Sequence, residues 1–590
     1  MLLEKEFALL YSLLKQGEVL GSQRETAKKL GISLGAANAL LQKAVRSGWT
    51  ADKRLTAKGA AALGPYRVNN AIIMAAGSGS RLAPLSYTKP KGLLRVRGEV
   101  LIERQIRQLQ AAGISEIIVV VGYMKEQFFY LEQNFSVKIV TNPDYYRYNN
   151  TSTLMQVLGS LKNTYICSSD NYFVDNVFEP YVYQSYYAAV YKDGPTDEYC
   201  LSCNARGRIT GVRIGGADSW YMMGQAYFSQ SFSAQFREVL QKEYERPSTR
   251  QELWEDMYRR HLDVLPLYIK KYSSEKILEF DSLDELRAFD NFYIDNVDSA
   301  ILKNISRVLQ CEVKDIRDIK TLKSGMTNLS FVFCCLGKLY VYRHPGPGTA
   351  AYVNRQSEAF SMEQAQRLGL DRSFIYMDAA EGWKISHYIS GAHDLDYANS
   401  REVSQALQLL RRLHQAAIRS PYNFDVGQVI QGFVHQARVR NPQAFHEVED
   451  LMWQMKKAEQ FAAQQGVTKV LCHCDAFNTN FLVAPDGTVS LIDWEYSGND
   501  DPALDLGIFL CCSKYSWARV LEVIDEYLGH PASLEERQHY IAYAALAAFY
   551  CYAWAVYQET LEKPVGEYLY IWYKASGFFI EKLRETGAIE

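Results

Sequence analysis

The sequence predicts a multidomain chain: a small helical domain over residues 1–66, an α/β domain over 67–298 and an α+β domain of two lobes over 299–590. Three observations lead to this prediction. First, 590 residues exceed what one hydrophobic core usually serves. Second, strand, glycine-rich loop, helix and strand alternate from Asn70 onward, as in a parallel α/β sheet. Third, an antiparallel-looking stretch at 329–344 is followed by long helices.

Composition excludes a global attraction to nucleic acid or membrane, because the formal net charge is only −3. The opening MLLEKEFALL mixes acids with apolar residues, unlike a secretory signal, so we expect a cytoplasmic protein. The longest apolar run, Ile541 to Tyr557, is short for a membrane span and rich in tyrosine. We expect a buried helix there and no membrane segment. The cysteines lack a paired zinc spacing, which favours core thiols in a reducing compartment.

Residues 22–49 carry the pattern of a helix-turn-helix. Ser22 is suited to cap the first helix, Gly31 makes the turn and Ser33 caps the second helix. The segment that follows, up to 55–59, is long enough for a small wing. We therefore predict a winged helix-turn-helix domain over the first 66 residues.

Two interpretations of this domain stay open. Its second helix is rich in small apolar residues and offers few side chains that read bases, namely Asn38, Gln42 and Lys43. If the domain bound DNA, the phosphate contacts would come from Arg24, Lys28, Lys29 and Lys43. A packing or dimerisation module fits the same residues equally well, so DNA is a candidate partner and the oligomeric state is left open.

A glycine-rich loop follows the first strand of the α/β domain, in the segment AAGSGSRLAPLSYTKPKGLL. Gly77, Ser78 and Gly79 leave backbone N–H groups free to approach phosphate oxygens, which a larger side chain would block. Arg81 and Lys91 lie close enough in sequence to flank a triphosphate and to offset the negative charge that develops there. The combination predicts a nucleotide site.

This segment resembles the nucleotidyltransferase superfamily, whose signature is a strand followed by AAGxGxRxxPxTxxxPK; here Ser86 replaces the threonine. The resemblance continues through VVVGY, YNNTST and EFD, covers about 70 to 295, and is greatest to the bacterial phosphocholine cytidylyltransferases. It implies a Rossmann-like fold and the transfer of a nucleotide, here from CTP, to a phosphate substrate.

The resemblance also assigns site residues. Asp170 and Asp281 would hold Mg²⁺ against the α-phosphate, because carboxylate oxygens are the hard ligands that this ion prefers. The base and ribose pocket would include Gly122, Tyr123, Asn149 and Ser152. A quaternary ammonium cannot donate hydrogen bonds, so a choline site needs aromatic faces and carboxylates; the corresponding residues are Tyr199, Trp254, Glu255 and Glu279.

A second motif lies in LCHCDAFNTNFLV and LIDWEYSG, which together have the HxDxxxxN…D spacing of kinase-like phosphotransferases. By this resemblance Asp475 would orient the substrate hydroxyl and accept its proton. Asn480 and Asp493 would bind the Mg²⁺ ions that bridge the phosphates of ATP, and His473 would support the loop.

Upstream residues indicate which phosphotransferases the domain resembles. Arg343 occupies the strand position that holds a lysine in protein kinases, and with RxPGxGT and IDWEY this resembles the choline and ethanolamine kinases. Glu358 in the following helix is the expected ion-pair partner of Arg343. A phosphate-covering hairpin at 322–331 would contribute Ser324, Thr327 and Asn328. The resemblance spans about 301 to 590 and implies a protein-kinase-like fold of two lobes.

An aromatic stripe lies near the C-terminus, where Tyr550, Trp554 and Tyr557 follow helical spacing. Such a stripe is ordinarily core. Its match to the aromatic helix of choline kinases, together with Trp494 and Tyr496 beside the metal aspartate, favours a cation-binding box.

The two signatures describe consecutive reactions, because the product of a choline kinase is the substrate of a phosphocholine cytidylyltransferase. We therefore expect a bifunctional enzyme that uses ATP, CTP and Mg²⁺ to convert choline through phosphocholine to CDP-choline. Ethanolamine is the runner-up substrate, and a sugar-nucleotide enzyme joined to an antibiotic-type kinase comes third. A DNA-binding regulator whose transferase folds only sense ligands is the alternative from another class.

Overall fold

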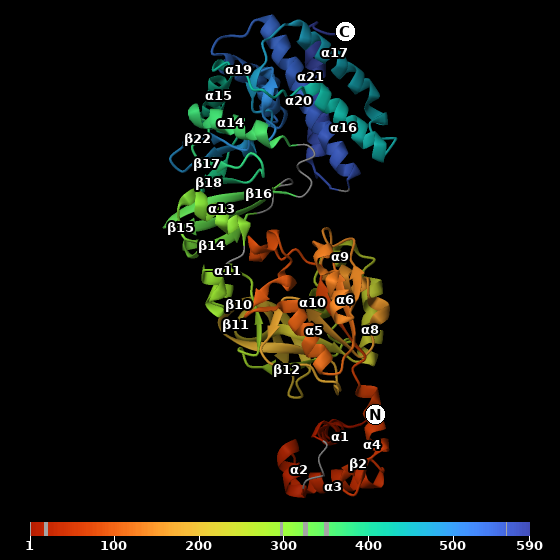
Figure 1. Ribbon diagram of the computed structural model, residues 1–590. Helices are drawn as coiled ribbons and strands as arrows, with labels where there is room; N and C mark the ends of the chain where they lie inside the picture. The colour runs from red at the N-terminus through yellow and green to blue at the C-terminus, as the bar shows by residue number, and fades with distance from the viewer. Residues whose placement is uncertain (1, 17–21, 296–298, 323–327, 347–352, 562) are drawn as a thin grey trace. The chain divides into compact units, whose positions relative to one another are not determined.

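The computed structural model describes residues 2–16, 22–295, 299–322, 328–346, 353–561 and 563–590. The chain forms two compact units, Met1–Lys303 and Asn304–Glu590 (Figure 1). The finer partition of the first unit at residues 66 and 67 stays a prediction.

The first unit opens with a small group of helices and a short hairpin. Their bounds are α1 (Glu4–Gln16), α2 (Gln23–Leu30), α3 (Leu34–Arg46), β1 (Thr50–Ala51), β2 (Arg54–Leu55) and α4 (Ala57–Ala62). Ser22 and Glu25 form a reciprocal capping box at α2, and Gly31 ends that helix in the left-handed conformation with φ 58°. The hairpin is shorter than the expected wing, because the Thr56 side chain caps α4 and the chain turns helical there.

A seven-stranded sheet forms the body of the first unit, in the order β12-β10-β11-β8-β3-β6-β7. The central strand β3 pairs parallel with β6 and β8, as the sequence predicts. The long hairpin of β10 and β11 is antiparallel and makes the sheet mixed, which the sequence pattern did not indicate. The strand bounds are β3 (Asn70–Ala75), β6 (Glu116–Val121), β7 (Lys138–Thr141), β8 (Thr164–Ser168), β10 (Tyr186–Cys203), β11 (Ile209–Phe228) and β12 (Tyr268–Tyr272).

Apolar side chains cover both faces of this sheet and form two cores. The helices of this unit are α5 (Leu101–Ala111), α6 (Tyr130–Phe135), α7 (Asn150–Met155), α8 (Gln230–Glu243), α9 (Pro247–Arg250), α10 (Trp254–Arg260), α11 (Leu283–Phe289) and α12 (Phe292–Asp295). Two short ladders complete it: β4 (Arg95–Val96) with β5 (Glu99–Val100), and β9 (Asn171–Phe173) with β13 (Ile277–Glu279). The second ladder pairs Glu279 with Asn171, immediately after Asp170, and so brings together residues predicted for one site.

The second unit has a small β-lobe and a larger helical lobe, as predicted. Its five-stranded sheet has the order β14-β15-β16-β18-β17. The elements of this lobe are β14 (Ile316–Thr321), β15 (Asn328–Cys335), β16 (Lys338–Pro345), α14 (Arg355–Arg367), β17 (Phe374–Met377) and β18 (Lys384–His387), preceded by α13 (Ala300–Leu309). The expected antiparallel stretch is the β15–β16 hairpin.

The helical lobe surrounds its core with α15 (Ser400–Gln415), α16 (Val426–Arg440), α17 (Glu449–Gln464), α18 (Ala503–Cys511), α19 (Trp517–Leu528), α20 (Leu534–Thr560) and α21 (Tyr568–Glu585). Short strands carry its loops: β19 (His393–Asp394), β20 (Val470–Cys472), β21 (Phe481–Val483), β22 (Val489–Leu491) and β23 (Gly498–Asp500). By length and composition α20 could cross a membrane, but 72% of its most apolar stretch is buried in the protein. It is the buried helix that the sequence predicts.

Candidate active sites

The first site gathers one lysine and three carboxylates at the end of the central strands. Lys91 Nζ lies 2.8 Å from Asp170 Oδ2, 3.1 Å from Asp281 Oδ1 and 3.3 Å from Glu279 Oε1. Arg81 Nη1 donates to the other oxygen of Asp281 at 2.7 Å. Asp170 follows β8, and the β9–β13 ladder brings Glu279 and Asp281 beside it across more than 100 residues of sequence.

The charges of this cluster shift one another's pKa. Burial disfavours the cation of Lys91, but the charges of Asp170, Glu279 and Asp281 outweigh it and raise its pKa. Burial likewise opposes ionisation of Asp170, yet Lys91 and Ser168 hold its pKa below the ordinary value. The charge of Asp170, followed by burial, raises the pKa of Glu279 to about 7. The pKa of Asp170 is therefore lowered while that of the neighbouring Glu279 lies near neutrality.

The glycine loop follows β3 and is shaped for a close approach. Gly79 has φ 60°, the left-handed region that favours glycine, and a Cβ there would lie 3.1 Å from Lys91 Cβ. Gly77 is exposed, and a Cβ at that position would have no protein atom within 4 Å. The loop thus leaves its backbone N–H groups open to a ligand.

Beside this loop lies a cavity of about 400 Å³ whose wall includes Gly77, Ser78 and Asn149. The other predicted pocket residues stand behind that wall. Gly122 allows Tyr145 to pack closely, because a Cβ would lie 2.5 Å from Tyr145 Cβ. The Tyr123 N–H donates to the Ala76 carbonyl at 3.0 Å, and buried Ser152 donates to Asn142 Oδ1 at 3.1 Å. Sequence reasoning missed the cavity residues Tyr145, Tyr146, Arg147, Tyr148 and Gln251.

The predicted choline residues of this unit are not all brought together. Trp254 is 1% exposed and stacks on Tyr187 at 5.5 Å, so its ring belongs to the core and cannot present a face to a ligand. Glu255 is buried and accepts a hydrogen bond from the Tyr187 hydroxyl at 3.0 Å. Burial raises the pKa of Glu255 to about 7. Tyr199 on β10 is half-buried, and burial, followed by the charge of Asp256, raises its pKa.

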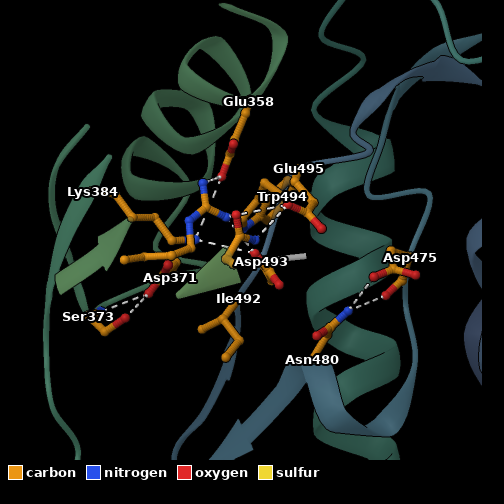
Figure 2. A network of polar contacts seen from close by, with 12 residues as sticks. Glu358, Asp371, Ser373, Lys384, Asp475, Asn480, Ile492, Asp493, Trp494 and Glu495 are labelled. Atoms are coloured by element: carbon orange, nitrogen blue, oxygen red, sulfur yellow. Dashed lines mark hydrogen bonds and ion pairs between the residues drawn. The ribbon is translucent and has the colours of Figure 1, made fainter. Parts of the chain in front are cut away.

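The second site begins at the loop after β20. Asn480 Nδ2 donates to Asp475 Oδ2 at 2.8 Å and to the Asp475 carbonyl at 2.7 Å (Figure 2). This leaves the amide oxygen of Asn480 for another partner. Asp475, Asn480 and Asp493 all line one cavity of about 350 Å³. Burial, followed by the charge of Asp493, raises the pKa of Asp475 well above its ordinary value.

Two residues of this site have an unusual backbone. Cys474 and Asp493 have φ 63° and 64°, in the left-handed region that non-glycine residues rarely adopt. Asp505 holds the first of these turns, because its carboxylate accepts the N–H groups of His473 and Cys474, each at 2.7 Å, and also bonds His414 Nε2 at 2.9 Å. Sequence reasoning missed Asp505, because it lies in the segment after Asp493 and belongs to no motif of its own.

A buried ion network holds Asp493. Arg343 Nη1 donates to Asp493 Oδ1 at 2.9 Å, and its other terminal nitrogen pairs with Glu358, the expected partner. Lys384 Nζ lies 3.4 Å from the same Asp493 oxygen. Burial opposes the charge of Asp493, but Lys384 and Arg343 lower its pKa to about 2.

Further members of the network stand behind these residues. Arg355 Nη1 donates to Glu358 Oε2 at 2.8 Å, and Asn328 Nδ2 donates to Glu495 Oε2 at 2.9 Å. Asn328 therefore contacts a carboxylate of the site. The other two residues predicted from the phosphate-covering hairpin, Ser324 and Thr327, lie outside the described residues.

The cavity beside Asp475 is rich in aromatic rings. The predicted Tyr496 and Trp554 line it with Tyr550, and sequence reasoning missed Phe477, Tyr568 and Trp572. Two other predicted residues are not in its wall. Trp494 has no exposed surface, and its indole N–H donates to the Leu491 carbonyl at 3.0 Å. Tyr557 stacks on Phe433 at 5.7 Å. Both serve packing around the cavity in this structure.

Comparisons with known proteins match both units. Residues 319–543 match the model of the choline/ethanolamine kinase family, and residues 71–205 match that of MobA-like NTP transferase domains. The chain is 37% identical over 229 residues to 2-aminoethylphosphonate cytidylyltransferase of Lancefieldella rimae, with 38% of this chain and 93% of that relative covered.

It is 31% identical over 220 residues to choline-phosphate cytidylyltransferase of Streptococcus pneumoniae, with 37% of this chain and 96% of that relative covered. The crystal structure of the choline kinase LicA from Streptococcus pneumoniae shares 26% identity with a TM-score of 0.42, over 48% of this chain and 98% of that one.

Proposed function

Because the chain belongs to the bacterial cytidylyltransferase family and joins that domain to a choline/ethanolamine kinase domain, we propose that it converts choline to CDP-choline in two successive reactions. The second unit phosphorylates choline with ATP. The first unit couples phosphocholine to CTP and releases pyrophosphate. Both co-substrates are cytoplasmic metabolites, so the cytoplasm is the proposed location.

The observation that carries this proposal is the cavity beside Asp475. It combines the half-buried carboxylate of Asp475 with the rings of Tyr496, Tyr550 and Trp554. A quaternary ammonium makes no hydrogen bonds and is recognised by aromatic faces and nearby negative charge. The hydroxyl of the same small molecule then reaches Asp475.

In the proposed kinase reaction, the choline oxygen attacks the γ-phosphorus of ATP, the bond from that phosphorus to ADP breaks, and Asp475 takes the hydroxyl proton. A raised pKa makes the Asp475 carboxylate a stronger base than an exposed aspartate. The Asn480 amide oxygen and the Asp493 carboxylate are hard donors on one cavity wall and fit Mg²⁺. When bound, that ion stabilises the negative charge of the phosphates.

In the proposed cytidylyltransferase reaction, a phosphate oxygen of phosphocholine attacks the α-phosphorus of CTP and pyrophosphate leaves. The backbone N–H groups of 77–79 hold phosphate oxygens, and Arg81 and Lys91 offset the charge that builds up on them. Asp170 and Asp281 converge on one point and fit a Mg²⁺ ion, which supplies further positive charge when bound.

Ethanolamine is the second candidate substrate, and one comparison favours it. The Lancefieldella relative is named for 2-aminoethylphosphonate, whose primary ammonium resembles that of phosphoethanolamine. Buried carboxylates such as Glu255 could accept hydrogen bonds from such a group. The six aromatic rings of the kinase cavity favour choline instead, because rings add nothing that a hydrogen-bonding ammonium requires.

A competition assay tests the proposal. The protein receives equal choline and ethanolamine with ATP, CTP and Mg²⁺, and mass spectrometry follows each phosphate ester and CDP ester. A parallel reaction offers phosphocholine, phosphoethanolamine and 2-aminoethylphosphonate without ATP. We expect phosphocholine and CDP-choline to form faster than the corresponding ethanolamine products. Preferential CDP-ethanolamine, or no product that depends on both ATP and CTP, would overturn the choline assignment.

We also propose that residues 1–66 form a winged helix-turn-helix that contacts DNA. These residues hold ten Lys and Arg against five Asp and Glu, although the whole chain has a formal net charge of −3. Arg24 and Lys28 are exposed on α2, and Lys53 and Arg54 are exposed at the hairpin. Lys43, in contrast, pairs with buried Glu6 and is less suited to a phosphate contact.

A gel-shift titration with the gene's own upstream region tests this second proposal at low and physiological salt. Counterion release should weaken binding steeply as salt rises. Replacing Lys53 and Arg54 by Gln should weaken binding, whereas the exposed control Lys192→Gln should not. The absence of a sequence-selective shift at either salt would leave the domain a packing or dimerisation module.

A further inference from the structure

Lys384 is a buried cation that no sequence motif indicates. It lies on β18 directly opposite Arg343 on β16, as Cα partners of an antiparallel pair. The side chain of Arg343 is only 6% exposed and that of Lys384 only 11%. Like charges opposite each other on neighbouring strands repel, and burial strengthens that repulsion. A packing role alone would be served better by an uncharged residue.

The two cations are held in place by shared anions. Lys384 Nζ lies 3.4 Å from Asp493 Oδ1 and 3.7 Å from Glu358 Oε1. Arg343 donates to the same Asp493 oxygen at 2.9 Å. Figure 2 shows Glu358 reaching from its own helix toward Lys384 and Asp493. One oxygen of Asp493 therefore serves two cations.

Lys384 depends on Asp493 more than Arg343 does. Glu358 already pairs with Arg343 and with Arg355, the latter at 2.8 Å, whereas its distance to Lys384 is 3.7 Å. If Asp493 turns to a divalent cation, Arg343 keeps Glu358 and Lys384 loses its nearest anion. Lys384 then keeps only Glu358, at 3.7 Å and shared with two arginines, so a further anion beside Lys384 is favoured.

We propose that Lys384 binds the phosphate groups of the nucleotide in the second unit, and that it holds Asp493 until nucleotide and metal arrive. The inference rests on the proposed kinase function. In a kinase, the divalent ion binds together with the negatively charged triphosphate. Lys384 can therefore exchange Asp493 for the triphosphate while Asp493 turns to the metal ion, and each charge keeps an opposite partner. Lysine suits such an exchange, because its flexible stem and three rotatable donors can change partner while the Arg343 fork stays fixed.

The experiment measures metal and nucleotide binding separately in the full chain. ATP is titrated into the parent and into Lys384→Met by calorimetry in EDTA, and Mn²⁺ is titrated without nucleotide by electron paramagnetic resonance. The first unit is the same in both proteins, so any difference belongs to the second. We expect ATP to bind about ten-fold more weakly to Lys384→Met, the loss of one charge-assisted hydrogen bond.

Mn²⁺ binding should change in the opposite direction. It should tighten in Lys384→Met, because a positive charge beside Asp493 is gone. Lys384→Arg should restore ATP binding, and Lys338→Met, at an exposed position on β16, should resemble the parent in both titrations. The KM for ATP should rise in Lys384→Met while the KM for choline stays constant.

Opposite shifts of the two affinities support the proposal, because a purely structural lysine would move both in the same direction or neither. Equal ATP affinity of parent and Lys384→Met would overturn it, and so would a joint loss of ATP and Mn²⁺ binding with a lowered melting temperature. A parent protein that phosphorylates no alcohol would overturn the proposed kinase function, and this inference with it.

Discussion

In the first site, two neighbouring carboxyl groups differ in pKa and therefore suit different roles. Asp170 lies 2.8 Å from Lys91 and keeps a lowered pKa, whereas Glu279 lies 3.3 Å from the same nitrogen and its pKa rises to about 7. The ionised Asp170 suits a metal ligand. Glu279 suits contact with a substrate ammonium, whose positive charge favours its ionised form.

The pKa of Glu279 predicts a pH dependence. Below pH 7 its carboxyl group is protonated and loses the charge that attracts the ammonium, so kcat/KM for phosphocholine should fall as pH drops. The fall between pH 8 and pH 6 should be about ten-fold for one such group. A coupled pyrophosphate assay at saturating CTP measures it.

Glu279→Gln is the control for this dependence. It should lower kcat/KM at pH 8 and flatten the profile between pH 8 and 7, where the parent already loses activity. The phosphate of the substrate, which titrates near pH 6, contributes equally in both proteins. A variant profile as steep as that of the parent above pH 7 would contradict the role of Glu279.

Among the elements, α20 contributes two aromatic residues to the wall of the kinase cavity. Helical spacing puts Tyr550, Trp554 and Tyr557 on one face, yet only the first two line the cavity. Tyr557 instead stacks on Phe433 of α16, with the ring centroids 5.7 Å apart. Because α20 extends beyond the cavity, the last residue of its aromatic stripe packs against the core and does not line the cavity.

Trp554→Leu should therefore raise the kinase KM for choline with little effect on the KM for ATP. An aromatic face contributes about 0.5 to 2 kcal/mol toward a quaternary ammonium, which corresponds to a rise of about two-fold to thirty-fold. Steady-state kinetics with each substrate varied in turn measures this.

Tyr557→Leu is the matched control on the same helix. It should lower the melting temperature and leave the KM for choline near that of the parent, because its ring contacts Phe433. Equal losses for choline and ATP in Trp554→Leu would point to a core role for that residue too.

Residues on local motifs could be predicted from the sequence, whereas residues that reach the site through tertiary contacts could not. The loops that bear Asp475, Asn480 and Asp493 are local, so their spacing indicates a site before any fold is known. Lys384 and Asp505 reach the same site from 109 and 31 residues away, through strand pairing and helix packing that no local pattern encodes. Trp254 and Trp494 were predicted to face a ligand but are buried, because residue type and position near a motif do not reveal burial.

At the scale of the whole molecule, the N-terminal helices pack against other parts of the first unit, away from its candidate site. Phe7 of α1 contacts Tyr183 at 5.5 Å, the Tyr11 hydroxyl bonds Glu179, and Lys15 pairs with Glu179 at 3.1 Å. The glycine-rich loop at 77–79 and the carboxylates of both candidate sites lie outside these helices. We therefore expect these helices to stabilise the unit without contributing to its chemistry.

A chain beginning near Gly64 should keep both activities. Its melting temperature should fall by several degrees, since the partly buried Tyr181 and Tyr183 lose their cover and with it a share of the about 1.5 to 3 kcal/mol that full burial of a large apolar side chain contributes. Differential scanning calorimetry and the two activity assays measure these effects. Loss of either catalysis in a truncated protein that still folds would show that the helices take part in the chemistry.

In the proposed function, one chain carries out two reactions at two independent sites, with Asp170 in the first unit and Asp475 in the second. The direct measurement gives choline, ATP, CTP and Mg²⁺ to Asp475→Asn, to Asp170→Asn and to an equal mixture, and follows phosphocholine and CDP-choline by mass spectrometry. Asp475→Asn should form neither product yet convert added phosphocholine, Asp170→Asn should accumulate phosphocholine, and the mixture should form CDP-choline. A folded variant that loses both half-reactions would contradict the claim.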